Sequence, residues 1–196
     1  MVGYRLDKNS FLEILEQWNR FLKRKVHLIA CGGTAMTLLD IKASTKDVDF
    51  MIPDVREHTY LTKTIQKMGY RPQTTAGWKL ESDVFVFDLF SGNKIHTTEL
   101  LDSPFGAGKH TLLKEFSRLY VGVLNDFDLI SSKLIRGTGV DMDDCAALVK
   151  ARGHNIDIDL LTSHFRELVG YDIAVERANS NYDRFLDRLR EENLYD

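Results

Sequence analysis

Helical periodicity marks both ends of the chain. From Ser10 to Lys23, apolar residues recur every three or four positions, and Ser10 followed by Glu13 three residues later is typical of a capped helix start. A second helix is expected over about Val55–Met68. From residue 125 onward the same period dominates, so the pattern predicts that the last third of the chain is helical.

Strand-like runs lie between these helices. Val26–Ala30 is a short apolar run bounded by charge, and Asp47–Ile52 begins with alternating polar and apolar residues. Two further runs, Gly77–Leu80 and Asp83–Phe90, are separated by a polar turn. Residues 91–123 show no clear period. The first two thirds of the chain therefore mix strands with helices.

A glycine pair follows the first strand. Gly32 and Gly33 have no Cβ, so the backbone can turn tightly there and another group can approach the following amides. Thr34 is expected to cap a short helix over Ala35–Leu39. The N-terminus of a helix behind glycines attracts anions.

Two carboxylates occupy the start of the next strand. Residues two apart share a face, so Asp47 and Asp49 project together while Val48 and Phe50 point into the core. Such a pair is unfavourable on a half-buried sheet unless a cation neutralises it, and hard divalent ions take oxygen ligands. The alternative is a pair of solvated carboxylates, which a lone Asp-x-Asp usually is. The preceding Gly-Gly-Thr turn favours a site for Mg²⁺ or Mn²⁺.

The segment Cys31–Phe50 resembles the signature of the nucleotidyltransferase superfamily, the fold of DNA polymerase beta. The match lies in the run hydrophobic-Gly-Gly-Thr-Ala and, about a dozen residues later, Ser-Thr-Lys-Asp-Val-Asp-Phe. More narrowly, it resembles the minimal prokaryotic nucleotidyltransferases that include abortive-infection toxins of toxin–antitoxin pairs. Those proteins often carry Ser at the position of Gly33 and Arg at the position of Lys42.

The resemblance implies an α+β fold in which a small mixed β-sheet is flanked by helices and followed by a C-terminal helical lobe. The catalytic core would span residues 1–124 and the lobe residues 125–196, within one compact unit.

A third carboxylate is implied on a neighbouring strand. Asp88 interrupts a run of large hydrophobic residues, where a buried carboxylate is costly without a partner. By resemblance, Asp88 completes the metal-binding set with Asp47 and Asp49. One alternative is that Asp88 lies on a solvated face of the sheet, and another is that Asp83, at a turn, takes its place.

The resemblance also implies a nucleotide-binding set. The related toxins have a helix of the form Leu-x-x-x-Lys-Leu-x-Arg followed by Asp-x-x-Asp, in which the lysine contacts nucleotide phosphates. Here Lys133, Arg136, Asp141 and Asp144 match that pattern. The residues expected to bind nucleotide are Gly32, Gly33, Thr34, Lys46, Lys133 and Asp144.

The implied activity is transfer of a nucleoside monophosphate from an NTP to an acceptor hydroxyl, by two-metal in-line displacement. The acceptor could be tRNA, a protein or a small molecule, and a cognate antitoxin is a further possible partner. One alternative is a catalytically silent domain of a toxin–antitoxin pair that binds nucleotide or a partner, although retention of all three carboxylates speaks against it. Another is a structural domain with accidental acidic strands.

Composition excludes several other classes of protein. With 196 residues, 43% of them hydrophobic, and a net charge of −3, the chain offers no electrostatic case for coating nucleic acid. No run approaches the ~18 apolar residues of a membrane span, and residues 1–10 lack an apolar signal core, so we expect a cytoplasmic protein. Cys31 and Cys145 lie far apart without companion histidines, which argues against zinc and a disulfide.

The glycine-rich stretch Ser103–Thr111 only superficially resembles a phosphate-binding loop. Ser103 stands where the first glycine belongs, and His110 replaces the Ser or Thr that should follow Lys109. We therefore expect a glycine-rich connection, with His96, His110 and Lys109 solvated.

Overall fold

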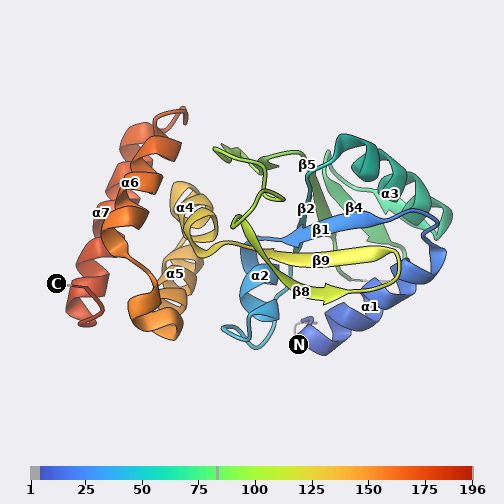
Figure 1. Ribbon diagram of the computed structural model, residues 1–196, viewed down its shortest axis with the longest axis horizontal. Helices are drawn as coiled ribbons and strands as arrows, with labels where there is room; N and C mark the ends of the chain where they lie inside the picture. The colour runs from blue at the N-terminus through green and yellow to red at the C-terminus, as the bar shows by residue number, and fades with distance from the viewer. Residues whose placement is uncertain (1–4, 83, 196) are drawn as a thin grey trace.

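A seven-stranded mixed sheet forms the centre of the computed structural model, which describes residues 5–82 and 84–195 (Figure 1). Its strand order is β3-β4-β5-β2-β1-β9-β8, and β6 pairs with β7 in a separate ribbon. The strands are β1 (Val26–Ala30), β2 (Val48–Ile52), β3 (Tyr70–Pro72), β4 (Gly77–Leu80), β5 (Phe87–Ser91), β6 (Lys94–Ile95), β7 (Thr98–Glu99), β8 (His110–Glu115) and β9 (Leu119–Leu124). Asp83, considered above as an alternative ligand, lies outside the described residues.

Helices flank the sheet and follow it. They are α1 (Lys8–Phe21), α2 (Gly32–Leu38), α3 (Val55–Lys67), α4 (Asp126–Arg136), α5 (Gly139–Arg152), α6 (Ile158–Val169) and α7 (Val175–Glu191), with a 3-10 turn over Gly153–Asn155. The α+β class and the helical C-terminal part are as predicted. No helix within the described ranges combines the length and the apolar character needed to cross a membrane.

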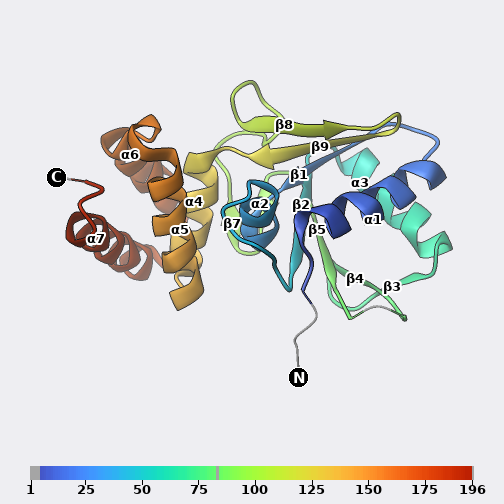
Figure 2. The same ribbon diagram turned by 90° about the horizontal axis from the view of Figure 1, so that it is seen from below.

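The C-terminal helices stand to one side of the sheet, and α2 lies between them and the strands (Figures 1 and 2). In this lobe α4 packs against α5, α6 and α7, and it also contacts α2. On the sheet, Trp18 of α1 packs its ring against Phe87 and Tyr70, at centroid distances of 5.1 and 5.6 Å. Burial of these large rings supplies much of the hydrophobic driving force that fixes α1 on the sheet.

The strand directions place the acidic residues. β1 pairs parallel to β9 and antiparallel to β2, and β2 in turn pairs parallel to β5. In the β2–β5 register, Asp49 lies opposite Asp88. Because cross-strand partners share a face of the sheet, the two carboxylates project to the same side.

Several predicted boundaries are wrong for identifiable reasons. Helix α1 starts at Lys8, because the side chain of Asp7 and not Ser10 accepts the capping hydrogen bond, from the Ser10 amide at 2.8 Å. The strand expected over Asp83–Phe90 begins only at Phe87. Strands β8 and β9 have no counterpart in the prediction; a register shift between Leu112 and Lys114 breaks the alternation that would have indicated β8.

Candidate active site

Three carboxylates lie close to the points where β2 and β5 begin. Asp49 and Asp88 are register partners, and Asp47 precedes β2 by one residue. Asp49 is only 3% exposed, Asp88 is half-buried, and Asp47 is exposed. Within the described residues, no group of three or more His, Cys, Asp or Glu side chains is arranged so that it could hold a metal ion as it stands. The strands therefore place Asp49 and Asp88 on one face of the sheet, next to Asp47, without a complete set of metal ligands among the described residues.

Burial and neighbouring negative charges raise the pKa values of Asp49 and Asp88. Burial, followed by the negative charge of Asp88, raises the pKa of Asp49 to about 7, against the opposing effect of Arg136. Burial also raises the pKa of Asp88, and the charge of Asp47 adds to that shift. Asp88 and Asp47 thus disfavour ionisation of Asp49, and Asp47 disfavours ionisation of Asp88, as expected of carboxylates that share a site.

The glycine turn makes room for Asp49. Gly32 has φ +55°, in the left-handed region, and a Cβ there would lie closer than 3.0 Å to Oδ2 of Asp49. The amide of Cys31 donates to the carbonyl oxygen of Asp49 at 3.2 Å, which ties the turn to β2. A Cβ on Gly33 would lie 2.6 Å from Oγ1 of Thr45. Both glycines are thus required by close approach of the loop and strand that carry the carboxylates.

Thr34 links the two halves of the motif. Its Oγ1 accepts a hydrogen bond from the Asp49 amide at 2.8 Å and donates to the Asp47 carbonyl oxygen at 3.2 Å. The prediction that Thr34 caps the helix is wrong: α2 begins at Gly32, and its N-cap residue is Cys31. The hydroxyl instead positions the backbone of the Asp-x-Asp strand, a local bond that competes with capping.

The predicted Lys133 and Asp144 come together beside the carboxylates. Nζ of Lys133, whose side chain is 2% exposed, lies 2.7 Å from Oδ2 of Asp144 and 3.5 Å from Oδ1 of Asp141. Nζ of Lys42 lies 2.8 Å from the other oxygen of Asp144. Lys46 is exposed on the loop before β2. The site therefore combines the carboxylates of β2 and β5 with nearby cations, of which Lys133 belongs to α4.

Comparison with known proteins identifies the fold. No family model and no curated protein matches the chain. Among solved structures, an antigenic nucleotidyltransferase-like protein from Paracoccidioides brasiliensis is similar at 13% identity and a TM-score of 0.51, over 96% of this chain and 94% of that one. The nucleotidyltransferase toxin MenT4 from Mycobacterium tuberculosis aligns at 15% identity and a TM-score of 0.47, over 83% of this chain and 65% of that one.

The chain has the nucleotidyltransferase fold. Its sheet and its flanking helices thus provide the framework in which the three carboxylates, the glycine turn and the cations of α4 are placed.

One residue beside the carboxylates, His96, was not predicted as part of the site. Nε2 of His96 lies 3.8 Å from Oδ1 of Asp49 and 3.4 Å from Nη1 of Arg136. His96 is exposed, as expected, but it also borders Asp49 and contacts Arg136. His96 follows β6 in the turn to β7, with φ +51°, and its ring packs edge-on against Phe90. No hydrophobic pattern accompanies strands of two residues, so the sequence does not indicate this placement.

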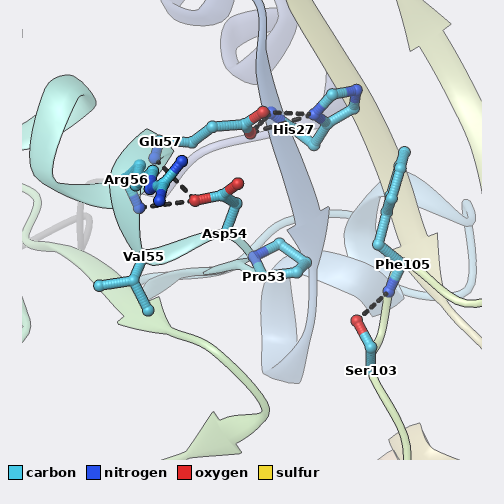
Figure 3. A pocket seen from close by; sticks show the side chains of 8 residues that line it. All are labelled: His27, Pro53, Asp54, Val55, Arg56, Glu57, Ser103 and Phe105. Carbon is cyan, nitrogen blue, oxygen red and sulfur yellow. Dashed lines mark hydrogen bonds and ion pairs between the residues drawn. The ribbon is translucent and has the colours of Figure 1, made fainter.

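A separate pocket of about 580 Å³ lies away from the carboxylates (Figure 3). His27, on β1, and Pro53, just after β2, line it, whereas the carboxylates lie at the other end of β2. In it, Nδ1 of His27 lies 2.9 Å from Oε1 of Glu57, and Phe105 packs against the His27 ring. We therefore place the candidate active site at the carboxylates and not in this pocket.

Proposed function

We propose that this protein is a metal-dependent nucleotidyltransferase that moves a nucleoside monophosphate from an NTP to an acceptor hydroxyl. One observation carries the proposal: Asp49 and Asp88 are opposite each other on parallel strands, with Asp47 two residues away and Gly32 leaving space beside Asp49. Carboxylates on neighbouring strands are ligands of the kind that bind divalent ions in phosphoryl-transfer sites, which supports the proposal.

The donor set fits a hard divalent cation. All three side chains are carboxylates, which Mg²⁺ and Mn²⁺ prefer, and their mutual repulsion is what a bound cation would relieve. Asp47, Asp49 and Asp88 would hold it. When bound, divalent ions polarise the reacting phosphate and stabilise the charge of the pyrophosphate leaving group.

The other residues of the site have distinct tasks in this proposal. Gly32 and Gly33 let Asp49 and Thr45 pack directly against the turn, and Thr34 keeps Asp47 and Asp49 in register through its two hydrogen bonds. Lys133 and Asp144 form the buried pair behind the phosphate position, and exposed Lys46 adds positive charge at the entrance. The main catalytic contribution expected of such groups is to stabilise the negative charge that develops on the phosphates in the transition state.

The proposal is tested by following labelled phosphate. With Mg²⁺, each of the four NTPs is supplied with label at either the α or the γ position, together with total tRNA, bulk protein or an aminoglycoside. Transfer of the α label and not of the γ label is expected, because nucleotidyl transfer releases the outer two phosphates as pyrophosphate.

The same assay carries its own control variants. Asp88→Asn is expected to lower the rate about 10³-fold, since a metal ligand contributes several kcal/mol of transition-state stabilisation. Asp187→Asn, at an exposed surface ion pair with Arg190, should leave the rate unchanged. Equal transfer by wild type and Asp88→Asn would contradict the proposal.

A protein that binds nucleotide or a partner without turnover is the second candidate function. The feature that favours it is the lack of a finished ligand shell among the described residues. It predicts that Mg²⁺ with NTP raises the melting temperature while no label is transferred to any acceptor.

A further inference from the structure

Resting on the proposed function, we propose that Arg136 contacts the triphosphate of the bound nucleotide directly, and that Lys133 acts from behind it as a buried positioning residue. This reverses the assignment that the motif alone favours, in which the lysine contacts phosphate. The contacts of the two cations decide between the assignments.

Lys133 has little capacity left for a ligand. Its ammonium group can donate three hydrogen bonds, and it lies within ion-pair distance of both Asp144 and Asp141. Its side chain is 2% exposed, so a phosphate could reach Nζ only if buried ion pairs opened. Breaking a buried pair leaves an uncompensated buried charge, which is strongly unfavourable. Lys133 is therefore better suited to hold the two aspartates than to bind an anion.

Arg136 has the opposite character. Its side chain is 41% exposed, and only one edge of its guanidinium is engaged: Nε donates to Oδ2 of Asp141 at 2.8 Å, and Nη2 donates to Oδ1. The remaining nitrogen, Nη1, faces His96, which itself borders Asp49. Arg136 thus presents Nη1, held only by the long 3.4 Å contact with His96, on the carboxylate side, where the phosphates must lie if the carboxylates hold the metal.

The electrostatics agree with this placement. The hydrogen bond to Asp141 and the charges of Asp49 and Asp47 raise the pKa of Arg136. Among the cations near Asp49, Arg136 lowers the pKa of that carboxyl more than Lys133 does. Of these two cations, Arg136 therefore has the larger effect on Asp49.

His96 fixes the direction of Nη1. Arginine can only donate, so Nε2 of His96 must be the acceptor in the 3.4 Å contact and must carry no proton. A charged phosphate oxygen is a stronger acceptor for Nη1 than Nε2 of His96 at this long distance. It could replace the imidazole as the partner of Nη1 without loss of a buried hydrogen bond.

The helix turn holds Arg136 in place. Arg136 is the last residue of α4, and Gly137 follows with φ +68° as its C-cap. A Cβ at Gly137 would overlap the side chain of Asn181 on α7, so the turn is pressed against that helix. Asp141 is fully buried in the capping box of α5 and also accepts from Oγ1 of Thr138 at 2.7 Å. The guanidinium is thus preorganised for an anion that binds in a fixed orientation.

The test is calorimetric binding of α,β-methylene analogues of the four NTPs in Mg²⁺, compared with the matching monophosphates. Arg136→Gln is expected to weaken triphosphate binding at least tenfold, the effect of one lost charge-assisted hydrogen bond, and to change monophosphate binding much less. Arg152→Gln is the matched control: it removes an arginine that pairs with Asp126 at 2.9 Å in the same lobe, and triphosphate affinity should not change.

Two further variants keep the test decisive. Lys133→Met is expected to lower the melting temperature, because Asp141 and Asp144 lose their buried cation. If Arg136→Gln loses its cooperative melting transition, Arg136→Lys replaces it and should still show weaker triphosphate binding, since lysine cannot keep Asp141 and donate in the same fork geometry.

The outcomes separate this inference from the proposed function. Wild-type binding that Arg136→Gln leaves intact, or that Lys133→Met removes at an unchanged melting temperature, overturns the inference alone. Absence of binding to any of the four analogues by the wild type overturns the proposed function, and the inference with it.

Discussion

Asparagine in place of Asp49 is expected to abolish nucleotidyl transfer and, at pH 8 without divalent metal, to raise the melting temperature by roughly 5 °C. Asp49 is almost fully buried, and burial with the charge of Asp88 raises its pKa from 3.8 to about 7. At pH 8 the folded protein therefore carries an ionised carboxylate in an unfavourable place. Holding that charge costs about 4 kcal/mol as an upper bound.

The amide of asparagine has the same shape and no charge. Without a hydrogen-bond partner it would cost about 1–3 kcal/mol, which is less than the charge it removes. The variant is therefore predicted to be more stable and inactive, the trade-off expected where a strained charge serves a reaction.

The pH dependence gives the sign of this effect. Because the pKa of Asp49 is raised in the folded state, the free energy of unfolding of the wild type falls as the pH rises from 3.8 to about 7. The gap in melting temperature between Asp49→Asn and wild type should therefore be small near pH 4 and widen up to pH 8. Thermal melts at these pH values check this, with Asp187→Asn as a surface control. A variant less stable than wild type at pH 8 would contradict this interpretation.

Alanine in place of Gly32 is expected to cost about 3 kcal/mol or more of unfolding free energy and to abolish activity. Two penalties combine: the left-handed φ of +55° costs a side chain about 1–2 kcal/mol, and the new Cβ would overlap Oδ2 of Asp49. Relief of the overlap requires Asp49 to move, so the carboxylate cluster would be lost even if the protein folds.

The matched control for Gly32 is Gly92. It also has a positive φ, +74°, but no atom lies within 4 Å of a Cβ built there. Gly92→Ala should therefore show only the backbone cost and should retain activity. Urea denaturation of both variants measures the difference, and equal losses would show that contact with Asp49 does not matter.

Local features of the site could be predicted from the sequence. The apolar run of β1, the glycine pair and the alternating Asp47 and Asp49 are each encoded within a few residues, where strand period and glycine geometry are decisive. The helical lobe followed from apolar spacing in the same way. The structure places β1 at the predicted residues and starts β2 one residue later than predicted.

Long-range features could not be predicted in this way. That Asp88 lies opposite Asp49 depends on the register between β2 and β5, which many intervening residues and their packing decide. Gly122 interrupts the apolar run of β9, which weakens the strand pattern in the sequence. A Cβ at Gly122 would lie 2.8 Å from Cδ1 of Ile29 on β1. The glycine that weakens the strand pattern is required by close packing between strands. The positions of His96 and Arg136 beside Asp49 likewise depend on elements that meet only in the folded chain.

The most direct test of the central claim is Mn²⁺ binding, followed by electron paramagnetic resonance at pH 8, with wild type, Asp88→Asn and Asp187→Asn. If Asp47, Asp49 and Asp88 form one metal site, wild type and Asp187→Asn should bind Mn²⁺ equally, and Asp88→Asn should bind it at least tenfold more weakly, about 1.4 kcal/mol. Equal Mn²⁺ affinity in all three proteins would contradict the claim that these carboxylates act together.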